Sequence, residues 1–262
     1  MKIWAVANQK GGVGKTTTAV TLGGLLAGEG VKTLLVDLDP HGSLTTYFGN
    51  DPDTIVSSVY NLFRIDQKIT ARDILLPTRF ENLSILPSST ALATLDRQLG
   101  KQDGMGLVVA QALAELAGEY DYVLMDCPPI LGMLMVNALA ACNHLIVPVQ
   151  TEFLALKGLE RMLRTLKMVQ RARGAELSYT VVPTLFDRRT RASRDTCAAL
   201  RDQYSENLWS GVIPVDTQLR EASQAGVPLS MYKPSSRAVV AYQELLNNLD
   251  GRDPEIEQVQ AQ

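Results

Sequence analysis

A glycine-rich stretch near the start of the chain, Lys10-Gly-Gly-Val-Gly-Lys-Thr-Thr17, limits the possible folds more than any other feature of the sequence. It follows an apolar run at residues 3–7 that predicts a short buried strand, and residues 16–26 predict a helix. Glycines between a strand and a helix let backbone N–H groups turn inward, and the helix N-terminus adds a positive dipole end. The stretch is therefore predicted to hold phosphate groups.

Individual residues of this loop have separate expected roles. Lys15 is expected to reach β- and γ-phosphates, and the Thr16 hydroxyl is expected to bind Mg²⁺. The usual pattern G-x-x-x-x-G-K-[ST] is not met, because position 9 is Gln and a second lysine, Lys10, begins the loop. The predicted nucleotide-binding residues here are Lys10, Gly11, Gly12, Val13, Gly14, Lys15, Thr16 and Thr17.

Two further apolar stretches, residues 32–39 and 121–126, predict buried strands that end in carboxylates, Asp39 and Asp126. Open α/β sheets bind ligands at the carboxyl ends of their strands. Each aspartate can therefore hold Mg²⁺ or orient an attacking water beside the phosphate loop. The alternative for Asp126 is a carboxylate that only caps its strand. His41 is expected to be a surface histidine without a partner.

The order of elements predicts one large α/β domain. Strands alternate with helices along 262 residues, of which 46% are hydrophobic. We therefore predict a three-layer P-loop NTPase, with a mostly parallel twisted sheet and helices on both faces. Residues 1–249 would form this domain, and residues 250–262 a polar, disordered tail. The net charge of −3 excludes a globally basic nucleic-acid binder, so any DNA contact needs a local patch.

Arginines provide a candidate patch in the second half of the chain. Residues 184–194 predict one loop after a strand, and residues 209–214 predict the last strand. The loop contains four arginines: Arg188, Arg189, Arg191 and Arg194. They are either solvated and paired with Asp187 and Asp195, or they contact the phosphate backbone of DNA. The sequence leaves both interpretations open.

Several features predict a cytoplasmic protein. The three cysteines form no C-x-x-C pair, which is typical of a reducing compartment. The first residues lead directly into the predicted strand, so we expect no signal peptide. No apolar run approaches the length of a membrane span, and we expect no membrane insertion.

The loop K-G-G-V-G-K-T-T resembles the deviant Walker A motif of the MinD/ParA family of ATPases. The resemblance implies that Lys10 crosses to the nucleotide of the partner subunit in a homodimer that forms on ATP binding. The segment around Asp39 resembles switch I and implies that Asp39 takes part in hydrolysis. The family continues Pro-Gln-Gly there, whereas this chain has Pro40-His41-Gly42. Asp126-x-Pro-Pro resembles switch II.

Two late segments, residues 183–187 and 213–222, resemble those that flank the adenine base in the family. They imply that Pro214 and Asp216 bind the nucleotide, and that Arg220 and Arg237 belong to a DNA-contacting region. The acidic tail lacks the basic amphipathic helix by which MinD proteins bind membranes.

The resemblance implies a slow, Mg²⁺-dependent ATP hydrolase that cycles between monomer and ATP-sandwich dimer to position a cargo. A protein partner that anchors it or stimulates hydrolysis, non-specific DNA, and a nucleoid-associated or polar location are further implications. Residues 39–43, 86–93 and 149–155 resemble ParA homologues that place chemotaxis arrays, so these arrays are the expected cargo. The alternative cargo is a chromosome or plasmid. Rival classes are an iron–sulfur cluster carrier, which needs paired cysteines, and a non-hydrolysing regulator.

Overall fold

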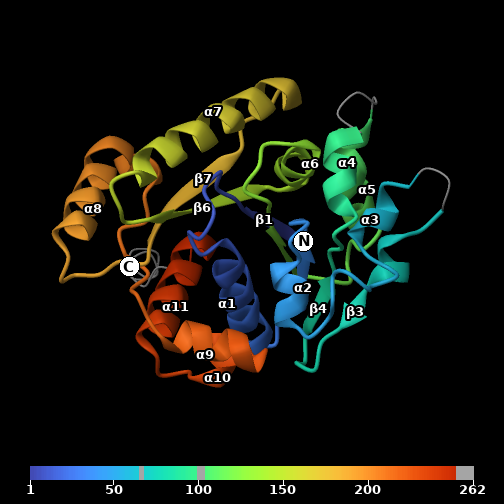
Figure 1. The fold of residues 1–262 in the computed structure, drawn as a ribbon, viewed down its shortest axis with the longest axis horizontal. Helices are drawn as coiled ribbons and strands as arrows, with labels where there is room; N and C mark the ends of the chain where they lie inside the picture. Colours follow the sequence, from blue (N-terminus) through green and yellow to red (C-terminus); the bar gives the residue numbers. More distant parts are fainter. Residues whose placement is uncertain (65–67, 99–103, 252–262) are drawn as a thin grey trace, which may run out of the picture.

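A computed structural model of the protein describes residues 1–64, 68–98 and 104–251. Its centre is a seven-stranded sheet with the order β3-β4-β2-β5-β1-β6-β7 (Figure 1). Neighbouring strands are parallel, except for β3 and β4, which pair antiparallel. The strands are β1 Lys2–Val6, β2 Thr33–Asp37, β3 Leu76–Pro77, β4 Leu83–Leu86, β5 Tyr122–Asp126, β6 His144–Gln150 and β7 Ser178–Thr184.

Helices cover both faces of this sheet (Figure 1). The α-helices are α1 Lys15–Gly28, α2 Ser43–Tyr47, α3 Val59–Leu62, α4 Leu92–Gln98, α5 Val108–Ala114, α6 Met133–Ala141, α7 Ala155–Arg173, α8 Arg191–Tyr204, α9 Gln218–Ala225, α10 Leu229–Tyr232 and α11 Arg237–Asp250. Short 3₁₀ helices are η1 Ala71–Ile74, η2 Met105–Leu107 and η3 Ser205–Asn207. No helix among the described residues combines the length and the apolar character that crossing a membrane requires.

Two hydrophobic cores lie on opposite faces of the sheet. Within β1, Ala5 belongs to one core, together with residues of α5, α6 and α7, whereas Trp4 and Val6 belong to the other, together with α1 and α11. This alternation follows from the strand period of two. Strands covered on both faces are apolar throughout, which is why they were visible as continuous apolar runs. The predicted α/β fold, a mostly parallel sheet between two helical layers, is confirmed.

Three sequence predictions about local elements are wrong. Residues 209–214 form no strand of the sheet, because only scattered backbone hydrogen bonds, from Trp209 to Val181 and from Ile213 to Pro183, and one isolated bridge at Pro214 join them to their neighbours. The predicted helix at residues 70–76 is the 3₁₀ helix η1, followed by β3. The four arginines do not share one loop, because α8 begins at Arg191 and includes Arg194.

The last helix ends against the opposite end of the chain. Asp250, the final residue of α11, accepts hydrogen bonds from Lys2 Nζ at 2.8 Å and from the Tyr122 hydroxyl. Asp250 was predicted to begin the polar tail, but it belongs to this helix. Gly251, the next residue, caps the helix in a left-handed conformation, and residues 252–262 of the predicted tail lie outside the described residues.

Candidate functional site

The glycine-rich loop connects β1, at the centre of the sheet, to α1. Gly12 and Gly14 have φ angles of 74° and 89°, which other residues rarely adopt. A Cβ atom at Gly11, Gly12 or Gly14 would meet nothing within 4 Å, so packing does not require these glycines. No side chain caps the first turn of α1. The loop is therefore an open cradle of backbone at a helix N-terminus, as an anion site requires.

This cradle forms one wall of a hollow of about 930 Å³, a size suited to a nucleotide. The predicted site residues that line it are Gly11, Gly12, Gly14, Lys15, Thr16, Thr17, Asp39, Asp216 and Arg220. Val13 points into the core instead, and Pro214 lies between two lining residues, Ile213 and Val215. The structure thus brings most of the predicted nucleotide-binding residues together.

Buried carboxylates meet at the base of the cradle. Asp37 and Asp126 are paired in register on adjacent strands β2 and β5. Thr16 Oγ1 donates to Asp126 Oδ2 at 2.5 Å, whereas Asp126 Oδ1 is buried and accepts no hydrogen bond. Burial raises the pKa of Asp126 well above its usual range and that of Asp37 to about 7. An unpaired buried oxygen beside a second carboxylate and a hydroxyl is a donor set that fits Mg²⁺.

Asp39 follows Asp37 in the chain, donates its backbone N–H to Asp37 Oδ1 at 3.1 Å and lines the hollow. Its Oδ1 accepts a hydrogen bond from the His41 backbone N–H at 3.0 Å and lies 2.8 Å from His41 Nδ1. The expectation that His41 has no partner is therefore wrong. Its side chain is nevertheless 76% exposed, as expected for a surface histidine.

The two lysines of the loop have different surroundings. Lys15 is buried, lines the hollow, and its Nζ lies 3.5 Å from the Lys10 carbonyl oxygen. Lys10 is not among the residues that line the hollow within its own chain. Its ammonium contacts the Glu152 carboxylate and donates to Gln150 Oε1 at 2.9 Å, at the carboxyl end of β6.

The hollow is also lined by Thr184 and Leu185, which belong to the segment 183–187 that was expected to flank the base but were not named as site residues. Thr184 Oγ1 donates to the Val13 carbonyl at 2.8 Å and so ties β7 to the phosphate loop. Leu185 has a φ of 52°, a strained conformation for a bulky residue. Asp216, also in this wall, accepts backbone hydrogen bonds from Gln218 at 3.0 Å and Ala238 at 3.3 Å.

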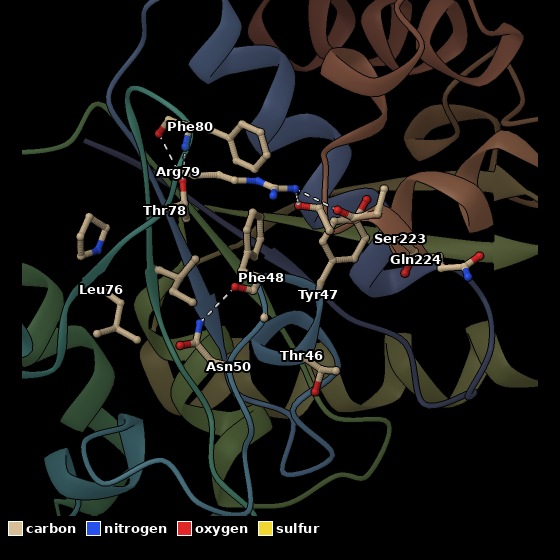
Figure 2. Close-up of a pocket in the computed structure, with 15 residues that line it drawn as sticks. Thr46, Tyr47, Phe48, Asn50, Leu76, Thr78, Arg79, Phe80, Ser223 and Gln224 are labelled. Carbon is tan, nitrogen blue, oxygen red and sulfur yellow. Dashed lines mark hydrogen bonds between the residues drawn. The ribbon is translucent and has the colours of Figure 1, made fainter.

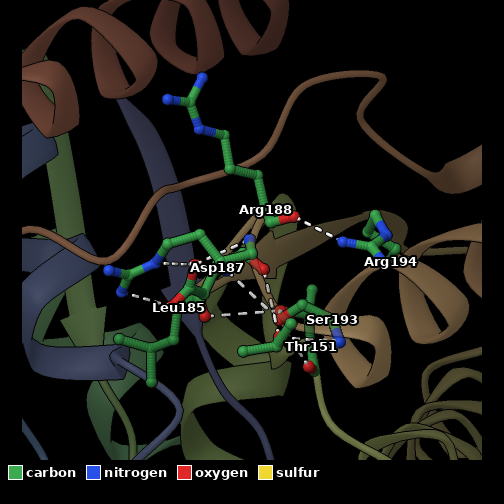
Figure 3. Close-up of polar contacts among 8 residues, drawn as sticks. Thr151, Leu185, Asp187, Arg188, Ser193 and Arg194 are labelled. Carbon is green, nitrogen blue, oxygen red and sulfur yellow. Dashed lines mark hydrogen bonds and ion pairs between the residues drawn. The ribbon is translucent and has the colours of Figure 1, made fainter.

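A small polar network lies next to Leu185, whose carbonyl oxygen is 3.5 Å from Thr151 Oγ1 (Figure 3). The hydroxyl oxygens of Thr151 and Ser193 are 2.8 Å apart, and Ser193 Oγ also donates to the Thr151 carbonyl at 3.1 Å. Thr190 caps α8 by accepting a hydrogen bond from the Ser193 backbone N–H. The network joins the carboxyl end of β6 to the start of α8, next to the four arginines.

The predicted arginine patch is partly neutralised. Arg189 donates to both carboxylate oxygens of Asp187, at 3.0 and 2.8 Å, and holds the pKa of Asp187 at about 2. Arg191 pairs with Asp195 at 3.2 Å. Arg194 donates to the Arg188 carbonyl at 2.8 Å, while the Arg188 side chain points away from this cluster (Figure 3). Arg237, the first residue of α11, is exposed.

A second hollow, of about 450 Å³, shares the lining residues Tyr47, Ser223 and Gln224 with the larger one (Figure 2). Among the described residues that line it, Arg79 is the only charged one, and it donates to the carbonyls of Ala225 and Gly226 at 2.9 and 3.1 Å. This second hollow is not lined by a backbone cradle or by carboxylates among the described residues. The larger hollow is therefore the better candidate for a nucleotide and its metal.

Comparison with known proteins identifies the family. A family described as "AAA domain" matches residues 1–179. The sporulation initiation inhibitor protein Soj of Bacillus subtilis is 37% identical over 245 residues, which cover 93% of this chain and 96% of that protein. This chain belongs to the AAA domain family and is a P-loop ATPase of the MinD/ParA type. The predicted family and the predicted enzyme class, an ATP hydrolase, are confirmed.

Two further similarities extend along the ATPase. The chromosome partitioning protein ParA of Myxococcus xanthus is 34% identical, with 96% of this chain and 89% of that protein covered. The crystal structure of a cobyrinic acid a,c-diamide synthase from Mycobacterium smegmatis, with bound ADP and magnesium, has a TM-score of 0.82 and 36% identity. It covers 95% of this chain and 94% of that one.

The cysteines of this ATPase are poor candidates for cluster ligands. Cys127, Cys142 and Cys197 are all buried. Burial raises the pKa of the Cys127 thiol well above its usual range and that of Cys142 to about 12. A cluster carrier needs paired cysteines, whereas these three are buried and form no C-x-x-C pair, which argues against the rival of an iron–sulfur carrier.

Proposed function

We propose that this ATPase binds ATP with Mg²⁺ in the larger hollow and hydrolyses it slowly. The observation that carries the proposal is the buried, unpaired Asp126 Oδ1 beside Thr16, at the foot of an open backbone cradle. A related protein, 36% identical, was crystallised with ADP and magnesium, which supports this choice of ligands. Isothermal calorimetry with ATP, with and without Mg²⁺, tests it, and phosphate release measures the hydrolysis.

Each residue of the site has a distinct proposed role. The Lys15 ammonium would face the β- and γ-phosphates, and Thr16 and Asp126 would hold the metal. Mg²⁺, when bound, would neutralise charge on the phosphate oxygens. Asp39, at the rim of the hollow, would orient the attacking water and can also contact the metal through water. Pro214 and Asp216 would flank the base.

The ATP-bound form is proposed to be a homodimer that meets through the phosphate-loop face. Apolar side chains are exposed on loops that border this face, with Ile130 64% and Phe153 84% exposed. Ile130 follows Pro129, which lines the hollow, and Phe153 follows Glu152, which contacts Lys10. A dimer that meets through this face would cover both side chains, and apolar and aromatic groups are typical of the buried centre of an interface. Lys10 would leave Glu152 and reach the partner's nucleotide.

A chromosome or plasmid is the proposed cargo. The relatives reported above include a chromosome partitioning protein, and none of their names supports the expected chemotaxis arrays. The alternative named from the sequence is therefore the better supported one. A cytoplasmic, nucleoid-associated location and a partner protein that stimulates hydrolysis accompany this proposal. Following labelled chromosomal origins, plasmids and chemotaxis arrays in cells that lack the protein distinguishes the cargoes.

A further inference from the structure

A closed ring of buried hydrogen bonds connects Asp37, Thr45, Ser88 and the main chain of Asp39. Asp37 Oδ2 accepts from the Thr45 N–H at 2.8 Å and from the Thr45 hydroxyl at 2.7 Å. Thr45 Oγ1 in turn accepts from the Ser88 N–H at 2.8 Å. Ser88 Oγ donates to the Asp39 carbonyl at 2.6 Å, and the Asp39 N–H donates to Asp37 Oδ1 at 3.1 Å. These bonds join the ends of β2 and β4 to the first half of α2.

The ring fixes the main chain of Asp39 on both sides. Its N–H is held by Asp37 and its carbonyl by Ser88. The chain then turns at Gly42, which has a φ of 61° and whose missing Cβ would lie 2.5 Å from Pro52. The Asp39 carboxylate, by contrast, forms hydrogen bonds only within its own loop, to His41, among the residues that the structure describes. The position of the Asp39 carboxylate therefore depends on the hydrogen bonds that hold its main chain.

We propose that Ser88 and Thr45 are positioning residues for ATP hydrolysis and act by holding Asp39 in place. The proposal rests on the proposed role of Asp39 in orienting water. Misplacing a catalytic group by about 1 Å can slow a reaction by about 100-fold. This role for Ser88 assigns a physical function to part of the segment Leu86-Pro-Ser-Ser89.

The neighbouring serine provides a matched control. Ser89 is also buried, at the same end of β4, and its Oγ accepts a hydrogen bond from Ser58 Oγ at 3.0 Å. Ser58 caps α3, so this bond holds another element and does not reach Asp39. Loss of either hydroxyl removes one buried hydrogen bond. Only the loss at Ser88 releases the Asp39 carbonyl.

The test compares four single variants of the full chain. Ser88→Ala and Thr45→Val are expected to lower kcat for ATP hydrolysis about tenfold, while the Kd for ATP changes less than about twofold. Ser89→Ala and Thr45→Ser, which keeps the hydroxyl, are expected to retain most of the rate. Hydrogen exchange in nucleotide-free protein gives a second measurement. The backbone amides within residues 39–49 should exchange faster than in the wild type in Ser88→Ala, and at the wild-type rate in Ser89→Ala.

The double variant of Ser88→Ala and Asp39→Ala decides whether Ser88 acts through Asp39. If it does, the double variant hydrolyses ATP no more slowly than Asp39→Ala alone. An additional tenfold loss, a wild-type kcat in Ser88→Ala, or equal losses in Ser88→Ala and Ser89→Ala would each overturn the positioning role. A wild-type rate in Asp39→Ala would instead refute the proposed role of Asp39, and the positioning role with it.

Discussion

The Lys10 ammonium contacts the Glu152 carboxylate of its own chain, 142 residues away in the sequence. The same ammonium is proposed to reach the nucleotide of a partner subunit, so the two contacts compete. Both side chains are partly exposed, which limits the strength of the pair to about 0.2–1 kcal/mol. Glu152 would therefore oppose dimerisation modestly and would not prevent it.

Glu152→Gln is expected to strengthen ATP-dependent dimerisation a few-fold, because the neutral amide holds Lys10 less tightly. Analytical ultracentrifugation with ATP and Mg²⁺ measures the association constant. In a Lys10→Ala background, Glu152→Gln should leave the association constant unchanged, since the Lys10 ammonium is then absent. An unchanged or weaker association constant in Glu152→Gln alone would show that the pair does not compete with the dimer.

Lys15→Ala is expected to weaken ATP binding by about 100-fold or more, because a buried charge facing the phosphates is lost. Isothermal calorimetry measures the affinity. Lys157→Ala, which removes an exposed lysine on α7, is the control and should bind ATP as the wild type does. Equal ATP affinities of the two variants would show that this loop does not bind the phosphates.

The parts of this site that the sequence predicted are local patterns. The loop before α1 and Asp126 at the end of β5 can each be predicted from a few consecutive residues. Buried parallel strands and glycine turns have local sequence patterns that do not depend on the rest of the fold. The contacts of Lys10 with Glu152 and of Ser88 with Asp39 depend on which strand ends become neighbours, and no local pattern specifies that order. The φ of Leu185 is likewise imposed by the surrounding chain.

Phe153→Glu is expected to block ATP-dependent dimerisation while ATP affinity stays within about twofold, because a charge would be buried at the proposed interface. Met168→Glu is the matched control, since Met168 is also an exposed apolar residue, 55% accessible, on α7. Sedimentation of both variants with ATP measures dimer formation. Dimerisation of Phe153→Glu at the wild-type constant would place the interface elsewhere.

His144 is expected to make the stability of the protein depend on pH. Burial lowers the pKa of its imidazole in the folded state, so the unfolded chain binds the proton more readily. The resulting stability is complete above the unfolded pKa of about 6.5 and declines as the pH falls below it. His144→Gln should therefore reduce the loss of Tm between pH 7.5 and 5.5. His41→Gln, at an exposed position, is the control, and equal effects of the two would contradict the role of burial.

Arg188→Glu is expected to abolish the ATP-dependent binding of non-specific DNA, because its side chain points away from the arginine cluster while Arg189 and Arg191 are paired with aspartates. A dimer would present this weak contact twice. Mobility shifts should show binding only with ATP, and the binding should weaken steeply as salt rises. Arg201→Glu, at the other end of α8, makes the same change of net charge and should still bind. Equal binding by both variants would place the DNA contact at residues other than Arg188. A wild-type dimer that binds no DNA at low salt would end the DNA hypothesis and leave a protein surface to hold this ATPase.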